Sequence, residues 1–194
     1  MRSGVNVSLN QRGKSTRMRK PFSQAFPQAS AGGAPTQVAA VCYRVREASV
    51  EFLLVNTTAG KWTFPKGRID PDLSASESAA REALEEAGAK GRIEKVHFGS
   101  YTDTKRAFGH ENRVREISIA AFLLEVADMV HPQEGDRNPT WFTPLEAQER
   151  LAERRAPKYA DGLARIVDAA VDRVIAASLS QNGVARSSRL VLQR

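Results

Sequence analysis

The sequence of 194 residues contains a single cysteine, three histidines and few aromatic side chains. One cysteine, Cys42, excludes an internal disulfide framework and a cysteine-rich zinc site. No two of the histidines have the spacing of a metal-ligand pair. The longest apolar runs, such as 117–126, are too short or too interrupted to span a bilayer, which excludes an ordinary membrane protein. Without an internal repeat, the chain is predicted to form one compact domain with terminal extensions.

Acidic residues are absent from the first 36 residues, and this absence accounts for most of the net charge of +7. Residues 1–36 carry +6 and residues 183–194 carry +3, whereas residues 37–182 carry −2. A large positive charge is typical of proteins that bind nucleic acid or another polyanion. The excess of positive charge lies at the two ends of the chain and not in the body. Nucleic acid is therefore a possible partner through the basic arm, but it is not the favoured partner.

The charge distribution divides the chain into three parts. We expect residues 1–36 to be a disordered basic arm, residues 37–180 the folded domain and residues 181–194 a flexible basic tail. The arm has too few aliphatic side chains to offset the entropy of ordering. Its composition also fits an organellar transit peptide, which we favour less. It has no apolar stretch like that of a secretory signal, and we predict a cytoplasmic protein.

Hydrophobic patterns predict both strands and helices. Apolar or β-branched runs predict strands at 37–46, 50–56, 62–65, 91–101, 117–126 and 141–142. A helix from Ser74 to Ala87 has a capping box, Ser74 with Glu77, and a C-terminal stop at Gly88. Two more helices are predicted at 143–153 and 160–179. Strands on both sides of a central helix, followed by C-terminal helices, indicate an α+β or α/β sandwich.

Three glutamates of the central helix are the first candidates for chemistry. Glu82, Glu85 and Glu86 stand at positions i, i+3 and i+4, so their carboxylates share one helix face. Such like charges repel one another, and a cation among them would remove the repulsion. Carboxylate oxygens suit Mg²⁺ or Mn²⁺. A glutamate-rich face is more often merely solvated, so the surrounding sequence has to decide.

The surrounding sequence resembles the Nudix hydrolase signature, Gly-x5-Glu-x7-Arg-Glu-U-x-Glu-Glu-x-Gly-U, where U is a bulky aliphatic residue. Six positions are in register with it: Gly67, Arg81, Glu82, Glu85, Glu86 and Gly88. The preceding run from Trp62 to Gly67 also resembles the lead-in of that family. Ala83 and Ala89 stand at the two U positions, and one departure matters. Leu73 replaces its first glutamate, which in the family is mainly a structural partner of the arginine, and Glu77 one turn on could partly substitute.

The resemblance implies a Nudix-type α/β/α sandwich with a mixed sheet, and hydrolysis of a phosphoanhydride bond. By position, Glu82 and Glu86 would ligate Mg²⁺, with Mn²⁺ as the alternative ion, and the Lys66 carbonyl would be a backbone ligand. Glu85 would be the general base or a further metal ligand. Arg81 would hold the glutamates in place by charge-assisted hydrogen bonds. Glu85 and Arg81 are therefore the catalytic candidates.

Basic residues around the signature favour a small, highly phosphorylated substrate. The candidate substrate contacts are Lys61, Gly67, Arg68, Arg115 and Arg137. The loop 102–115 adds further basic side chains, namely Lys105, Arg106, His110 and Arg113. This pattern resembles the Nudix branch that acts on diphosphoinositol polyphosphates and diadenosine polyphosphates. In a later loop, Glu134 is either an extra catalytic acid or part of a solvated turn. Phe108 could stack on a base, although packing is favoured.

Two alternatives remain open at this point. The first is an enzyme that hydrolyses other nucleoside diphosphate derivatives or RNA 5′ ends, which the basic arm would suit. The second is a non-enzymatic Nudix-like module that binds a nucleotide. The intact glutamates Glu82, Glu85 and Glu86 disfavour the second alternative. The oligomeric state cannot be predicted from these patterns.

Overall fold

The computed structural model describes residue 1 and residues 35–47, 49–106 and 114–191, with side chains described up to Ser180 except that of Arg106. Most of the predicted arm 1–36 lies outside these residues. So do residues 107–113 of the predicted basic loop, among them Phe108, His110 and Arg113. The expectations that concern them stay predictions.

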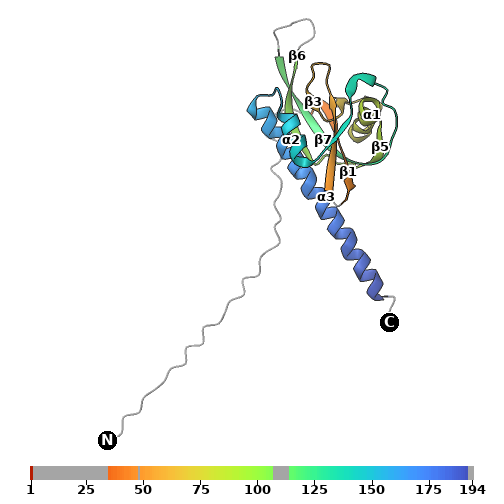
Figure 1. Cartoon of the computed structure of the whole chain (residues 1–194), viewed down its shortest axis with the longest axis vertical. Coiled ribbons are helices and arrows are strands. Elements are labelled where there is room, and N and C mark those ends of the chain that lie inside the picture. Colours follow the sequence, from red (N-terminus) through yellow and green to blue (C-terminus); the bar gives the residue numbers. More distant parts are fainter. Residues whose placement is uncertain (2–34, 48, 107–113, 192–194) are drawn as a thin grey trace. The chain divides into compact units, whose positions relative to one another are not determined.

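The described residues form an eight-stranded mixed sheet around one parallel pair of strands (Figure 1). In that pair, β1 (Gln37–Arg46) runs parallel to β7 (Val114–Met129). Six strands extend the sheet by antiparallel pairing: β2 (Ser49–Asn56), β3 (Trp62–Thr63), β4 (Lys66–Arg68), β5 (Ala89–Ile93), β6 (Gly99–Arg106) and β8 (Thr140–Phe142). The buried apolar runs that predicted strands therefore form the centre of the sheet.

The short strand β4 has a position that matters for the site. It pairs with the beginning of β1, where Lys66 lies opposite Ala39 and Arg68 opposite Gln37. β2 pairs with the other end of β1, so the two strands share one edge. β4 leads directly into α1 (Ala75–Ala87), and the two elements are in contact. The signature segment therefore lies at the end of the sheet where β1 begins.

Local signals set the ends of α1 as predicted. The Ser74 hydroxyl accepts a hydrogen bond from the Glu77 N–H, and the Glu77 carboxylate accepts one from the Ser74 N–H. At the other end Gly88 has a φ of 68°, in the left-handed region that favours glycine. A Cβ at Gly88 would also collide with the carbonyl oxygen of Val130. The predicted helix and both of its caps are confirmed.

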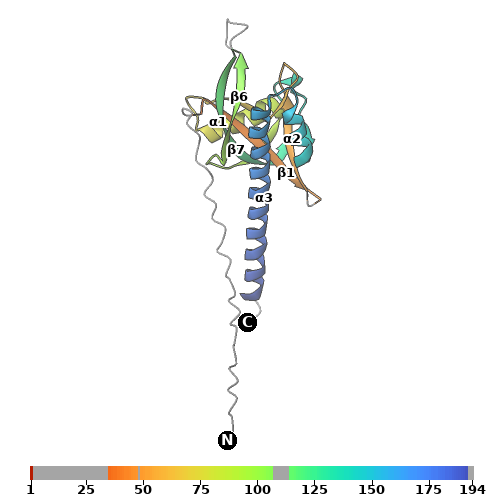
Figure 2. The same cartoon turned by 90° about the vertical axis from the view of Figure 1, so that its left-hand side faces the viewer.

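Helices cover both faces of the sheet (Figure 1). On one face, Ala79, Ala83 and Ala87 of α1 pack on side chains of β1, β2 and β7. These small side chains let the helix backbone lie close to the sheet. On the other face lie α2 (Pro144–Ala152) and α3 (Pro157–Val191), and Figure 2 shows α3 in front of the sheet, with its C-terminal part extending beyond it. The α/β/α sandwich with a mixed sheet is confirmed.

The first C-terminal helix agrees with prediction at both ends, whereas the second is longer than predicted. Thr143 caps α2 in a capping box with Glu146, as predicted. α3 is longer than the predicted 160–179 and continues into 181–191, which we expected to belong to a tail. Its buried side chains are Leu163, Ile166, Val167, Ala170 and Val174. The division into arm, domain and tail stays a prediction.

Three predicted strands are wrong in their extent. The predicted strand 117–126 is part of the longer β7, and the predicted loop 102–115 is partly strand, because residues 102–106 of β6 pair with residues 114–118 of β7. The run 91–101 is interrupted, because residues 94–98, which connect β5 to β6, do not continue the strand pairing with β7. Ile93 pairs with Leu124 and Gly99 with Ala121. Six residue positions from 93 to 99 therefore correspond to only three positions along β7, from 124 to 121. The extra residues loop out, and Val96 is 68% exposed. The predicted strand 62–65 is shortened to β3, which ends at Thr63, two residues before Pro65, which has no N–H to donate.

No helix within the described residues combines the length and apolar character needed to cross a membrane. The cytoplasmic location stays a prediction.

Candidate active site

The glutamates of the signature meet the backbone of β4. The Lys66 N–H donates a hydrogen bond of 3.0 Å to Oε2 of Glu86, which lies one turn beyond Glu82 on α1. A Cβ on Gly67 would collide with the carboxylate of Glu82. Glycine therefore allows this carboxylate to lie against the strand. The register read from the sequence thus corresponds to a direct contact between strand and helix.

Both of these carboxyl groups are less acidic than an ordinary glutamate. Burial, reinforced by the charges of Glu86 and Glu85, raises the pKa of Glu82 to about 7. Burial also raises the pKa of Glu86, whereas the Lys66 N–H and Arg137 favour its charged form. Glu86 is only 4% exposed. Two neighbouring carboxylates with disfavoured charges make a place where a bound cation would be strongly stabilising.

Arg137 contacts this pair from a distant part of the sequence. Its Nη2 lies 2.7 Å from Oε1 of Glu86, and its Nε lies 2.6 Å from Oε2 of Glu134. The Glu134 N–H donates a hydrogen bond of 3.0 Å to the carbonyl of Glu85, which fixes this loop on α1. The structure therefore brings both predicted loop residues to the glutamates. Arg137, predicted as a phosphate contact, is here the partner of a predicted metal ligand.

Arg81 has a partner that sequence reasoning missed. It donates a hydrogen bond to Oδ2 of Asp70, and its Nε lies 3.6 Å from Oε1 of Glu85. Arg81 therefore reaches one glutamate by an ion pair, and its hydrogen bond goes to Asp70. The prediction that Glu77 substitutes for the missing signature acid is wrong, because its carboxylate caps α1 through Ser74. Asp70 lies in the turn before α1, outside the helical repeat, so helical spacing does not predict this contact.

Basic side chains gather beside β4 on the face covered by α2 and α3. Burial is the main cause that lowers the pKa of Lys66, with smaller effects of the same sign from Lys105 and Arg155, whereas Asp103 favours the charged form. The Arg155 side chain is almost fully buried and lies 3.5 Å from Asp103. Farther along the β6–β7 hairpin, Lys105 stands directly opposite Arg115. Several cations thus flank the carboxylates at one end of the sheet.

Two other predicted substrate contacts lie around this region without touching the carboxylates. Lys61 is in the turn between β2 and β3, where its N–H donates to Oγ1 of Thr57. Arg68 is exposed at the end of β4. Within the described part of the chain, the signature glutamates Glu85 and Glu86 form ion pairs with Arg81 and Arg137 respectively. In the same part of the chain, neither Lys61 nor Arg68 forms an ion pair with a signature glutamate.

The donor atoms at this corner fit a hard divalent cation. Among residues 35–106 and 114–191, leaving aside 48, no three His, Cys, Asp or Glu side chains form a compact metal-binding group. The donors at this corner are the carboxylates of Glu82 and Glu86, and the Lys66 carbonyl stays a predicted ligand. Mg²⁺ commonly binds through one or two carboxylates and keeps several waters, so this donor set suits it.

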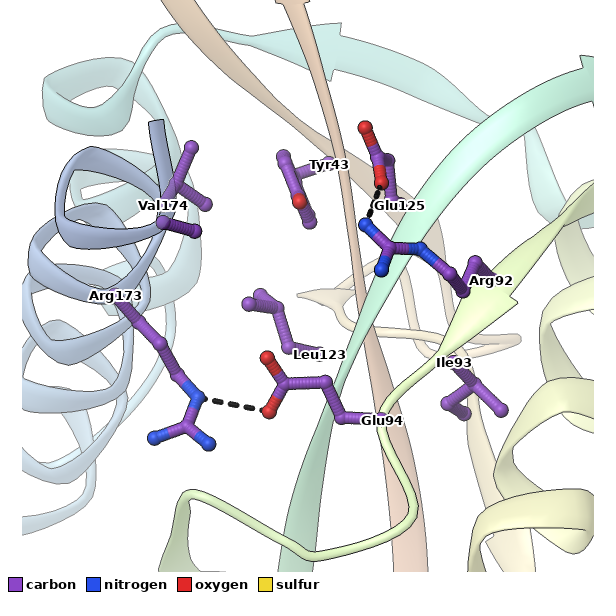
Figure 3. A pocket seen from close by; sticks show the side chains of 9 residues that line it. Tyr43, Arg92, Ile93, Glu94, Leu123, Glu125, Arg173 and Val174 are labelled. Carbon is purple, nitrogen blue, oxygen red and sulfur yellow. Dashed lines mark hydrogen bonds and ion pairs between the residues drawn. The ribbon is translucent and has the colours of Figure 1, made fainter. Parts of the chain in front are cut away.

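A cavity of about 220 Å³ lies elsewhere, beside the far end of β1 (Figure 3). Tyr43 and two ion pairs, Arg92 with Glu125 and Arg173 with Glu94, line it. These four charges neutralise one another, and the cavity contains none of the signature residues. The corner between β4 and α1 is therefore the candidate active site.

Comparison with known proteins identifies the family. The profile of the NUDIX domain matches residues 35–163. The chain belongs to the Nudix hydrolase family. This Nudix chain is 28% identical over 136 residues to diphosphoinositol polyphosphate phosphohydrolase 2 of Rattus norvegicus, covering 69% of this chain and 72% of the relative. It is 26% identical over 140 residues to diphosphoinositol polyphosphate phosphohydrolase 3-alpha of Mus musculus, covering 69% and 79%.

A solved structure shares the fold. The structure of a C. elegans Ap4A hydrolase binary complex has a TM-score of 0.54 and 20% identity, over 74% of this chain and 99% of that chain. The Nudix domain, together with relatives named as hydrolases, makes this chain an enzyme that hydrolyses phosphoanhydride bonds. The family prediction made from the signature is confirmed, whereas the roles of single residues stay predictions.

Proposed function

We propose that this Nudix hydrolase uses Mg²⁺ to cleave a phosphoanhydride bond in a small, highly phosphorylated substrate, either a diphosphoinositol polyphosphate or a dinucleoside polyphosphate. The observation that carries the proposal is that the carboxylates of Glu82 and Glu86, the carboxylate corner, lie at the same end of the sheet as a group of cations. These cations, Lys66, Lys105, Arg115 and Arg155, form what we call the cationic edge. Glu82 and Glu86 face β4 on one side of the sheet, and Lys66 and Arg155 flank Asp103 on the other.

The cationic edge favours a ligand with several negative charges. Lys105 and Arg115 stand opposite each other in the β6–β7 ladder, and like charges in that arrangement cost about 0.2–1 kcal/mol. A phosphate group beside them would convert this repulsion into attraction. The names of the curated relatives, diphosphoinositol polyphosphate phosphohydrolases, agree with this substrate class.

The residues of the corner have separable roles in the proposal. A bound Mg²⁺ would neutralise phosphate oxygens and lower the pKa of the attacking water. Glu82 and Glu86 would hold the ion together with the Lys66 carbonyl, because an adjacent cation favours the charged forms that burial disfavours. Glu85 has a side chain 33% exposed and accepts the proton of the water or adds a ligand. Arg81 keeps Glu85 in place by its ion pair.

A parallel substrate panel tests this function. Wild-type protein and Glu85→Gln would be assayed with dinucleoside polyphosphates, inositol pyrophosphates, ADP-ribose, oxidised dNTPs and RNA with a 5′ triphosphate, each in Mg²⁺ and in EDTA. We expect Mg²⁺-dependent turnover of an inositol pyrophosphate or a dinucleoside polyphosphate, and its loss in Glu85→Gln. Turnover confined to RNA or ADP-ribose would overturn the substrate class. Binding without turnover of any compound would identify a non-enzymatic module.

A further inference from the structure

We propose that Asp70 is a positioning residue that replaces the missing signature glutamate and holds Arg81 beside Glu85. The proposal rests on the proposed function, since Glu85 is the group that Arg81 orients there. It concerns a residue outside the positions that the family signature specifies, and four features of the structure carry it.

The first feature is the turn that joins β4 to α1. The Leu73 N–H donates a hydrogen bond of 3.2 Å to the carbonyl of Asp70, with Pro71 at the second position. This bond closes a four-residue β-turn, and the end residues of such a turn have Cα atoms within about 7 Å. A carboxylate at position 70 can therefore reach the region that a carboxylate at position 73 would reach. The substitution of leucine at 73 leaves this region supplied with an acid.

The second feature is the attachment of Asp70 to α1. Its N–H donates a hydrogen bond of 3.1 Å to Oγ of Ser78, whose own hydroxyl donates to the carbonyl of Ser74 at 3.0 Å. Ser78 is fully buried, so this anchor is shielded from water. The backbone of Asp70 is thus fixed on the helix three residues before Arg81.

The third feature is that the two oxygens of the Asp70 carboxylate accept hydrogen bonds from different partners. Oδ1 accepts a hydrogen bond of 2.9 Å from the Asp72 N–H, which holds the turn, and Oδ2 accepts from Arg81. The Asp72 N–H, followed by Arg81, lowers the pKa of Asp70 below its ordinary value. The carboxylate is therefore charged and oriented before any substrate arrives.

The fourth feature is the geometry of Arg81 between two acids. Its hydrogen bond goes to Asp70, while Glu85 stays at 3.6 Å, beyond normal hydrogen-bond distance. Without Asp70, the guanidinium would be free to turn and bond Glu85 directly. That bond would occupy the carboxylate that the reaction needs. Asp70 therefore keeps Arg81 in place and leaves Glu85 available.

Three variants test this role in the full-length protein with the best substrate of the panel. Asp70→Asn removes the charge, Asp72→Asn is the matched control in the same turn, and Leu73→Glu is added to Asp70→Asn as the rescue. We expect Asp70→Asn to lower kcat by about 10–100-fold, as outer-shell partners of metal sites do, with KM changed less than twofold. Asp72→Asn should match wild type, and Leu73→Glu should restore most of kcat. Equal kcat in Asp70→Asn and Asp72→Asn, or no rescue by Leu73→Glu, would overturn the proposal.

A double-mutant cycle tests whether Asp70 acts through Arg81. We expect Asp70→Asn to have no further effect in an Arg81→Gln background, both on kcat and on the Kd for Mn²⁺ measured by electron paramagnetic resonance. Additive losses would show that Asp70 acts by another route and would overturn the proposal. The Mn²⁺ measurement keeps this test separate from the proposed function: a wild type inactive on the whole panel would refute that function, while coupled losses of Mn²⁺ affinity would still support the positioning role.

Discussion

Replacing Glu82 by glutamine is expected to stabilise the metal-free protein above neutral pH. The carboxylate of Glu82 lies half-buried against Gly67, and burial together with Glu86 and Glu85 raises its pKa from 4.5 to about 7. The folded protein therefore binds a proton at pH values where the unfolded chain has released it. The folded state loses stability as the pH rises from 4.5 to about 7, and the full penalty is present above this window.

The size of the effect follows from the same pKa. A rise from 4.5 to about 7 corresponds to at most about 3–4 kcal/mol, at about 1.36 kcal/mol per tenfold change in proton affinity. Because the side chain is only half-buried, solvent screening reduces this figure, and we expect about 1–2 kcal/mol. Glutamine has nearly the same shape and no charge. The Glu82→Gln protein should equal wild type at low pH and exceed it by about 1–2 kcal/mol at pH 8.

The assay is urea unfolding in EDTA across this pH range, with Glu149→Gln as the control on an exposed part of α2. Wild type and Glu149→Gln should lose stability as the pH rises, and Glu82→Gln should lose much less. The Glu86 carboxyl, whose pKa is also raised, should leave a residual slope. The reasoning is refuted if the stability of Glu82→Gln falls with pH as steeply as that of wild type, or if Glu82→Gln is less stable than wild type at pH 8. Either result would show that the charged form of Glu82 is not disfavoured at this corner.

Three further predictions concern the same corner. Gly67→Ala should lower kcat at least about tenfold, because its Cβ would displace the carboxylate packed against the strand, whereas Gly135→Ala, whose Cβ meets open space, should not. Arg137→Gln should lower the free energy of unfolding at pH 7 by about 1–3 kcal/mol, because Glu86 loses a largely buried partner, and circular dichroism during urea unfolding would detect it. The control Arg150→Gln breaks an exposed pair and should cost less than about 0.5 kcal/mol; an equal loss in both variants would contradict this account. Removal of divalent metal by EDTA should abolish turnover without unfolding the domain, as monitored by circular dichroism, and turnover that persists in EDTA would exclude the metal-dependent mechanism.

Local features of this fold could be predicted from the sequence. The caps of α1 depend on residues within one turn of each helix end, so Ser74, Glu77 and Gly88 were sufficient to place it. The alignment of Glu82 and Glu86 on one face follows from helical geometry alone.

Features set by tertiary pairing could not be predicted. The interruption at 94–98 depends on the register of both β5 and β6 with β7, and the apolar run through it looks like one strand. Arg137 reaches Glu86 across 51 positions of sequence, through a loop docked on α1. Asp70 meets Arg81 because a β-turn folds back on the helix, and no periodic pattern encodes such a contact.

The hydrolysis rate of Glu86→Gln beside that of Glu149→Gln tests the central claim most directly. Both variants remove one glutamate charge, from the carboxylate corner and from exposed α2 respectively. With saturating Mg²⁺ and the best substrate of the panel, the account predicts wild-type kcat for Glu149→Gln and a loss of about 100-fold or more for Glu86→Gln. Equal rates in the two variants would contradict the claim that the corner between β4 and α1 is the metal-dependent active site.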